Sequence, residues 1–261
     1  MQLETKRSNN LISGASYFVD GIRLLLHPEL RLYILVPLVV NCFLFFILTT
    51  MLVTYLGNFV EGSSGFIPDQ LEPWIAPLKW VVWTILGVFL FIFYAYSFNM
   101  ITNVIAAPFY GLLAEKAEQL LTGRKPAEEA LGKMIPRVML RELQKLLYFF
   151  LRGIFITLLI LLIACVPLLQ FAAPLIGLAW GAWSMSIQYA DYPADNHRDP
   201  FRTLRSRLGH RTYSSFGFGG AIMACSIIPV VNIFAMPAAV AGGTIFWVSE
   251  LQDSELKDEK I

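Results

Sequence analysis

Four long stretches of the sequence contain no Asp, Glu, Lys or Arg, and they limit the possible folds more than any other feature. They cover residues 32–60, 80–114, 153–190 and 212–249, with lengths of 29, 35, 38 and 38 residues. About 20 apolar residues in a helix cross a bilayer, and an ionised side chain inside it is costly. Only 15% of the residues are charged, against about 25% in soluble domains. We therefore predict an all-α integral membrane protein in which residues 1–261 form a single membrane domain.

The lengths of these stretches predict how each one enters the membrane. We predict long transmembrane helices over 30–60 and 80–114, because each exceeds one membrane crossing. The two later stretches are too long for one crossing and contain prolines near their middle, where one helix should end and another begin. Arms of about 13 to 18 residues reach roughly 20 to 27 Å, less than the bilayer core of about 30 Å. Each later stretch is therefore predicted to form a partly penetrating hairpin, with helices restarting at Pro174 and Pro237.

Lys and Arg residues are distributed unevenly among the segments that flank the stretches. Residues 1–31 contain four, 61–79 contain one, 115–152 contain eight and 191–211 contain five. Such residues accumulate on the cytoplasmic side of membrane segments. If each 38-residue stretch crossed the membrane once, the Arg-rich segment would lie outside, whereas a hairpin returns it to the cytoplasm. We therefore predict that both termini are cytoplasmic, that 61–79 is a periplasmic loop and that 191–211 is a cytoplasmic Arg-rich loop.

The remaining segments are predicted to be an interfacial helix, a cytoplasmic helical segment, two hairpins and a cytoplasmic tail. Residues 8–28 carry apolar side chains at helical spacing, which predicts an amphipathic interfacial helix. Lys6 and Arg7 precede polar residues and not an apolar core, unlike the start of a signal peptide. The segment 115–152 is predicted to be a cytoplasmic helical segment with an apolar stripe beside a charged face, and we expect that face to be solvated. The predicted order is completed by intramembrane hairpins at 153–190 and 212–249 and a cytoplasmic tail at 250–261.

The sequence gives little support to enzymatic or cofactor chemistry. His27, His197 and His210 stand in no metal-ligand spacing and beside no plausible cysteine nucleophile. The three cysteines lack the paired spacing of a disulfide framework or a zinc site. A net charge of +1 provides no basic excess for a polyanion. We expect no catalytic residue, no metal, no cofactor and no nucleic-acid partner.

Two polar features allow more than one interpretation. The segment 191–201 contains carboxylates and an imidazole that could ligate a metal, but a proline-punctuated turn with capping Asp and Asn side chains is favoured. Asn99 and Asn103 lie one helical turn apart near the end of the second predicted crossing. They either line a polar path or hydrogen-bond between helices, and helix packing is favoured.

Broken helices inside a membrane provide a means of binding an anion. A helix that restarts at Pro174 or Pro237 would direct its positive N-terminal end toward membrane depth. Arg31 adds a cation at the start of the first predicted crossing, and a guanidinium group matches the oxygens of sulfate or phosphate. From the residues alone, the favoured interpretation of Arg31 is a topology anchor that extends its charge into the interface.

Several motifs together resemble one bacterial family. They are Asn103-Val104-Ile105-Ala106-Ala107-Pro108-Phe109, Gly111-Leu112-Leu113-Ala114-Glu115, Pro136-Arg137 with Arg141-Glu142 and Gln144-Lys145, the Asp-Tyr-Pro-x-Asp-Asn-His segment from Asp191, and Ile228-Pro229 with Asn232 and Met236-Pro237. Over nearly the whole chain the sequence resembles the CysZ sulfate permeases of bacterial inner membranes. The resemblance implies two spanning helices, two partly penetrating helix pairs, and sulfate uptake for cysteine synthesis.

The resemblance also implies a sulfate site just before the first crossing. The family's Gly-Leu/Ile-Arg-Arg segment corresponds to Glu29-Leu30-Arg31-Leu32, in which only Leu30 and Arg31 match. Glu29 stands in place of glycine and Leu32 in place of the second arginine, so an anion would meet one cation fewer and a nearby carboxylate. Arg23 could compensate for the missing arginine or serve as an interfacial anchor.

We therefore predict a sulfate permease, with Arg31 as the leading binding residue and sulfate or a related oxyanion such as sulfite as the ligand. The hairpins, with Pro174 and Pro237, are predicted to line the path. No GxxxxGK[ST] motif is present, so transport would follow a gradient or couple to an ion. Glu115, Glu118 and Asp191 are either proton sites or ordinary interfacial carboxylates. The short arms suggest a homo-oligomer in the lipid bilayer. The alternatives are a non-transporting scaffold that binds a partner through the Arg-rich loop, and a lipid-modifying enzyme.

Overall fold

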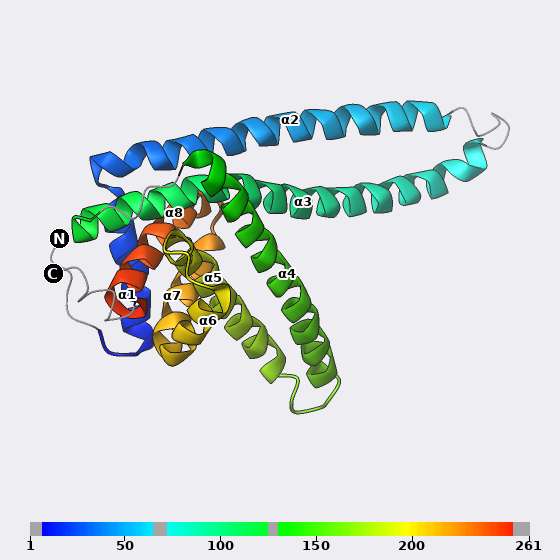
Figure 1. The fold of residues 1–261 in the computed structure, drawn as a ribbon. Coiled ribbons are helices and arrows are strands. Elements are labelled where there is room, and N and C mark those ends of the chain that lie inside the picture. Colours follow the sequence, from blue (N-terminus) through cyan, green and yellow to red (C-terminus); the bar gives the residue numbers. More distant parts are fainter. Residues whose placement is uncertain (1–6, 65–71, 125–129, 253–261) are drawn as a thin grey trace. The chain divides into compact units, whose positions relative to one another are not determined.

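The computed structural model describes residues 7–64, 72–124 and 130–252, and these residues form helices without any strand (Figure 1). The elements are α1 (Leu11–Leu25), a 3-10 turn (Pro28–Leu30), α2 (Arg31–Ser64), α3 (Glu72–Thr122), α4 (Leu131–Ala164), α5 (Ala172–Asn196), α6 (Phe201–His210), α7 (Thr212–Ser226), α8 (Pro229–Phe246) and a π-helical turn (Trp247–Leu251). The chain divides into a unit of residues 37–106 and a unit that combines 1–36 with 107–261. The predicted tail at 250–261 falls mostly outside the described residues.

The 37–106 unit consists of parts of two long helices. In all, α2 has 34 residues and α3 has 51, so both extend beyond the crossings predicted from the charge-free stretches. Large apolar side chains such as Phe46 and Phe91 are exposed. A hydrogen bond of 2.7 Å between the hydroxyl groups of Thr49 and Tyr94 connects α2 to α3. The two helices are therefore joined by a polar contact while much of their apolar surface remains uncovered.

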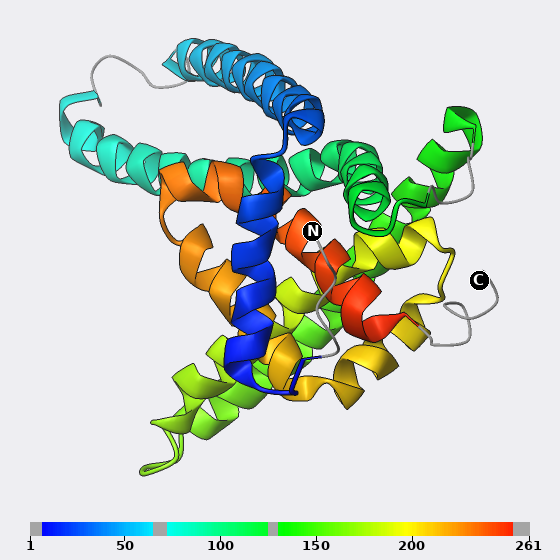
Figure 2. The same cartoon turned by 90° about the vertical axis from the view of Figure 1, so that its left-hand side faces the viewer.

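In the larger unit, α1 packs against both α7 and α8, as Figure 2 shows. Tyr17, Phe18 and Leu24 are buried, whereas Ile12 and Leu26 are exposed. The helix predicted over 8–28 is therefore present in its central part, and it has apolar residues on two sides. One side packs within the protein. The other remains uncovered, as a membrane-facing surface would be.

The helix α4 reverses the expected arrangement of polar and apolar side chains. The prediction that the charged face of the 115–152 segment is solvated is wrong, because Glu142 and Lys145 are only 2% and 1% exposed. The apolar stripe is exposed instead, with Leu147 and Phe150 uncovered. This occurs because α4 pairs with α5, and the two run side by side to the turn between them (Figure 1). The acidic residues of α5 provide partners for the charges of α4.

The two predicted hairpin breaks are present, but one helix starts earlier than expected. The first break separates Ala164 from Ala172, so Pro174 lies in the first turn of α5. The second separates Ser226 from Pro229, and Pro237 lies inside α8. The predicted restart at Pro237 is therefore wrong. Pro229 occupies the first helical position, where its missing N–H costs nothing, so the helix begins there.

The segment predicted as an Arg-rich loop over 191–211 is mainly helical. Its first part, with Pro193, forms the end of α5, and α6 follows. The favoured proline-punctuated turn is therefore wrong for 191–196. Leu204 and Leu208 of α6 are fully buried, and this burial supports a helix that its arginine content did not suggest.

Two helices among the described residues are long and apolar enough to cross a membrane. They are Gly132–Ala164, whose apolar window has a mean hydropathy of 2.6 and is entirely unburied, and Phe234–Leu251, whose window is 83% buried. The second is therefore similar to a core helix. The first has the uncovered apolar surface expected of a helix in contact with lipid.

Candidate functional site

The predicted anion site lies where a tight turn passes into α2. Pro28 begins a 3-10 turn that ends at Leu30, whose side chain is fully buried. Arg31 is the first residue of α2 and its side chain is exposed. Burial of Leu30 fixes the turn to the protein and leaves the neighbouring Glu29 and Arg31 at the surface. The N–H of Arg31 donates to the Pro28 carbonyl within the turn, so the attraction of this helix start for an anion comes from the helix dipole and the Arg31 side chain.

The Glu29 carboxylate, which the sequence suggested would oppose an anion, is paired. Its Oε2 atom lies 2.7 Å from Nζ of Lys116 on α3. The hydrogen bond and charge of Lys116 lower the pKa of Glu29 below its usual value, and the same contact raises the pKa of Lys116. Nζ of Lys116 also donates to Oε1 of Gln119 at 3.2 Å. The charge of Glu29 is therefore compensated locally.

The other predicted site residues differ in their surroundings. Arg31 makes no side-chain hydrogen bond or ion pair with any other residue that the structure describes. Leu32 is 71% exposed. Arg23 is mostly exposed and lies 3.2 Å from the carboxylate of Asp20, which also binds Arg7. Of the two candidate cations, Arg31 is the one with a guanidinium group available to a ligand.

The predicted pathway residues are not gathered around Arg31 by any contact that we observe. The side chains of Asn99 and Asn103 lie outside the described part of the structure. Pro174 is exposed near the start of α5, and Pro237 is buried inside α8. Their part in a pathway stays a prediction.

A buried ionic cluster between α4 and α5 was missed by the sequence analysis. Arg141 binds Asp191 through Nε and Nη2 at 3.0 and 2.7 Å, and Arg137 lies 2.5 Å from Asp195. Lys145 lies 2.5 Å from Glu142 and 3.3 Å from Asp191. The spacing of four between Arg137, Arg141 and Lys145, and between Asp191 and Asp195, places each set on one helical face. That spacing was the available signal for two facing rows of opposite charge.

Burial and ion pairing act in opposite directions on the pKa of Asp195 in this cluster. Desolvation raises the pKa of Asp195 above its usual value, while Arg137 acts in the opposite direction. Nζ of Lys145 lies 4.3 Å from the ring centre of Tyr192, which adds a cation–π contact. The cluster satisfies its charges internally, so it resembles a structural connection between α4 and α5 more than an open binding site.

The other carboxylates considered as proton sites are also engaged. Glu118 is buried and both of its oxygens lie within 3.0 Å of Nε2 of His197. Glu115 has an interaction partner, and Asp191 belongs to the ionic cluster. Within the described ranges, no group of three or more His, Cys, Asp or Glu side chains is arranged to hold a metal ion.

Most arginines of the 198–211 segment bind within the protein. Arg205 stacks over Tyr148 and Phe201, Arg207 pairs with Asp199 and Arg211 pairs with Glu250. By contrast, Arg202 is exposed and has no polar partner among the described residues. This segment therefore offers much less free positive charge than its composition indicates.

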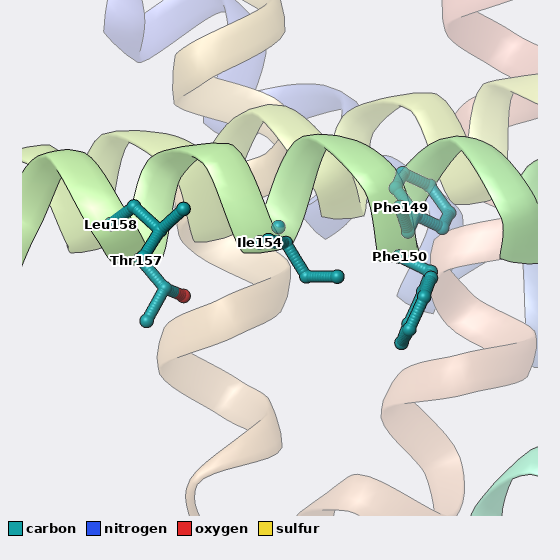
Figure 3. A pocket seen from close by; sticks show the side chains of 6 residues that line it. Phe149, Phe150, Ile154, Thr157 and Leu158 are labelled. Carbon is teal, nitrogen blue, oxygen red and sulfur yellow. The ribbon is translucent and has the colours of Figure 1, made fainter.

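A shallow hollow on α4 has no chemistry for an anion. It is lined by Phe149, Phe150, Gly153, Ile154, Thr157 and Leu158. Figure 3 shows these side chains along one helix, with the Thr157 hydroxyl as the polar atom among them. An apolar surface of this kind suits lipid chains or another apolar helix.

Together, the uncovered apolar helices and internally paired charges define a helical membrane protein. Residues 17–237 match the family described as Sulfate transporter CysZ/Etoposide-induced protein 2.4. A relative from Vibrio parahaemolyticus, named Sulfate transporter CysZ, is 38% identical over 250 residues, covering 95% of this chain and 98% of its own length. A protein of the same name from Pseudomonas aeruginosa is 37% identical over 243 residues, covering 92% of this chain and 96% of its own. The chain therefore belongs to the sulfate transporter CysZ family.

Proposed function

We propose that this protein is a permease that mediates sulfate uptake across the bacterial inner membrane and supplies sulfate for cysteine synthesis. The observation that carries this proposal is the similarity, over more than nine-tenths of both chains, to relatives named Sulfate transporter CysZ. Because the alignment covers nearly the full length of those relatives, the function is transferred for a whole protein and not for one shared segment.

We place sulfate binding at the start of α2, with Arg31 as the main cation. Its guanidinium group has no polar partner among the described residues, and the adjacent helix terminus favours negative charge. Glu29 is held by Lys116, so its carboxylate does not occupy Arg31. The buried Leu30 side chain holds the turn against the protein. Arg23 is a weaker candidate for sulfate binding because Asp20 already pairs with it.

The proposed membrane arrangement has two spanning helices, α2 and α3, of which the described residues include the shorter apolar stretches Cys42–Asn58 and Trp83–Ile92. It also has two partly penetrating hairpins, α4–α5 and α7–α8, in which α4 is itself long enough to cross a membrane. The exposed apolar side chains of α4 support contact with lipid, since their opposite face carries the buried charges. Both termini would face the cytoplasm, as the distribution of Lys and Arg predicts. A homo-oligomer would cover further apolar surface and enclose a larger polar pathway.

Transport in this proposal is driven by a sulfate gradient or by ion coupling, and no enzymatic step is involved. Entry of a divalent anion against an inside-negative potential of about 100 mV costs about 4.6 kcal/mol. Consumption of sulfate in the cell, or co-transport of protons, would offset that cost. The alternative of a partner-binding scaffold is disfavoured, because Arg205, Arg207 and Arg211 are used inside the protein.

The test is uptake of radiolabelled sulfate into liposomes that contain only the purified protein. Native protein should exceed empty liposomes, and Arg31→Ala should reduce uptake by about tenfold if a charge-assisted contact worth about 1.5 kcal/mol is lost. Arg202→Ala is the matched control, because Arg202 is also exposed and near the start of a helix. Uptake equal to that of empty liposomes would refute autonomous transport, whereas equal effects of both substitutions would refute the site.

A further inference from the structure

Lys116 pairs with Glu29 beside the proposed sulfate site, and nothing in the Glu29-Leu30-Arg31-Leu32 segment indicates this contact. It lies on α3 and contacts a turn more than eighty residues earlier in the chain. Its Nζ atom is held by two acceptors, Oε2 of Glu29 at 2.7 Å and Oε1 of Gln119 at 3.2 Å. Its side chain is 25% exposed and that of Glu29 is 50% exposed. The pair therefore lies at the surface, where an ion in solution can reach its surroundings.

This pairing decides how much positive charge an anion meets at the start of α2. Glu29 is only two residues from Arg31, and a glutamate carboxylate is ionised at neutral pH. With Lys116 present, the three side chains sum to a single positive charge. Without Lys116 they sum to zero, and the Glu29 carboxylate is free to pair with Arg31 or to repel an anion.

We propose that Lys116 is a positioning residue for sulfate: it holds the Glu29 carboxylate and so keeps the Arg31 guanidinium available to a divalent oxyanion. This inference rests on the proposed function, which places sulfate at Arg31. Gln119 supports the role because it holds Lys116 on the side of α3 that faces the turn. Exposed ion pairs contribute little to folding, so the pair has more influence on the bound anion than on the fold.

The expected size of the effect follows from the charges. A carboxylate roughly 8 Å from a dianion in water weakens its binding by about fivefold, by Coulomb's law with the dielectric constant of bulk water. Loss of Lys116 should therefore raise the sulfate dissociation constant by about fivefold. If Glu29 is removed as well, most of that loss should disappear, because the interfering charge is absent.

The experiment measures binding of radiolabelled sulfate to the purified full-length protein in detergent. Lys116→Gln should weaken binding about fivefold, Glu29→Gln should bind at least as tightly as the native protein, and the double variant should come within about twofold of native binding. Lys116→Arg should retain native affinity. Lys133→Gln is the matched control, since Lys133 is an exposed lysine with no polar side-chain partner among the described residues. Gel-filtration profiles establish that each variant is folded.

The possible failures are distinguishable. Native affinity in Lys116→Gln would overturn the inference, and so would a double variant as weak as Lys116→Gln, because Lys116 would then act through its own charge. If Arg31→Ala binds sulfate like the native protein, or the native protein binds none, the proposed site itself fails and the inference falls with it.

Discussion

Replacing Lys145 with Met should destabilise the protein strongly, because it removes one charge from a balanced buried cluster. The cluster contains three cations and three carboxylates, from Arg137, Arg141, Lys145, Glu142, Asp191 and Asp195. Lys145 is 1% exposed and lies between two of these carboxylates. Methionine fills a similar volume but leaves Glu142 and Asp191 with one compensating charge fewer.

The magnitude follows from the cost of an unpaired buried charge. Removal of one partner from a buried ion pair typically costs about 3–5 kcal/mol, since the remaining ion is kept from water. The lost contact with the Tyr192 ring adds to this cost. A change of 1 kcal/mol shifts the melting temperature of a chain of this size by about 2–4 °C, so the expected decrease is roughly 6–20 °C.

The assay is thermal unfolding of purified protein in detergent, with near-ultraviolet circular dichroism as the measure of tertiary packing. Lys133→Met is the matched control, because this exposed lysine lies on the same helix and should change the free energy of unfolding by less than about 0.5 kcal/mol. The double variant Lys145→Met with Glu142→Gln removes one charge of each sign. It should recover most of the loss, because the cluster is again neutral.

Equal shifts of the melting temperature in Lys145→Met and Lys133→Met would contradict a destabilising unpaired charge. A double variant no more stable than Lys145→Met alone would contradict it as well. In that case the loss would come from packing or from the hydrogen bonds of Lys145, and the balance of charge would not be its cause.

Two further predictions concern the packing of α1. Gly21→Ala should lower the free energy of unfolding by about 1–3 kcal/mol, because the added Cβ would collide with the Ala238 carbonyl. Gly153→Ala, which has open space around it, should be neutral or stabilising in the same thermal unfolding measurement. Burial and the hydrogen bond to Glu250 raise the pKa of Tyr17, so the unfolded state releases this proton first. The free energy of unfolding should therefore fall as pH rises above about 10. Urea titrations should show a smaller fall for Tyr17→Phe than for the native protein. The same dependence on pH in both proteins would contradict the assignment of this effect to Tyr17.

The helical class could be predicted from the sequence because it depends on where charges are absent. Prolines also indicated that the helices of the two later stretches are interrupted, and Pro174 lies in the first turn of α5. The choice between Pro229 and Pro237 could not be made in the same way. Both residues can begin a helix, and the position of α8 depends on the helices against which it packs.

The sequence could not predict which charged residues pair with one another in the fold. Arg141 and Lys145 were expected in water because charged faces usually are, and the partner that they share, Asp191, lies some fifty residues further along the chain. Lys116 was missed for the same reason, since only the tertiary fold brings it to Glu29. In both cases the residue types were visible, but the pairing depends on how distant helices meet.

The reversed polarity of α4 gives the strongest physical link between fold and function. In water, a helix that buries Glu142 and Lys145 while exposing Phe150 and Leu158 would pay both the cost of desolvating charge and that of hydrating apolar surface. In lipid, the exposed apolar side is in a favourable solvent, and the charges of α4 lie against α5, where Asp191 and Asp195 pair with them. In the proposed sulfate site, Arg31 lies at the edge of an apolar helix without a polar partner among the described residues, so its charge would remain available to an ion that arrives from solution.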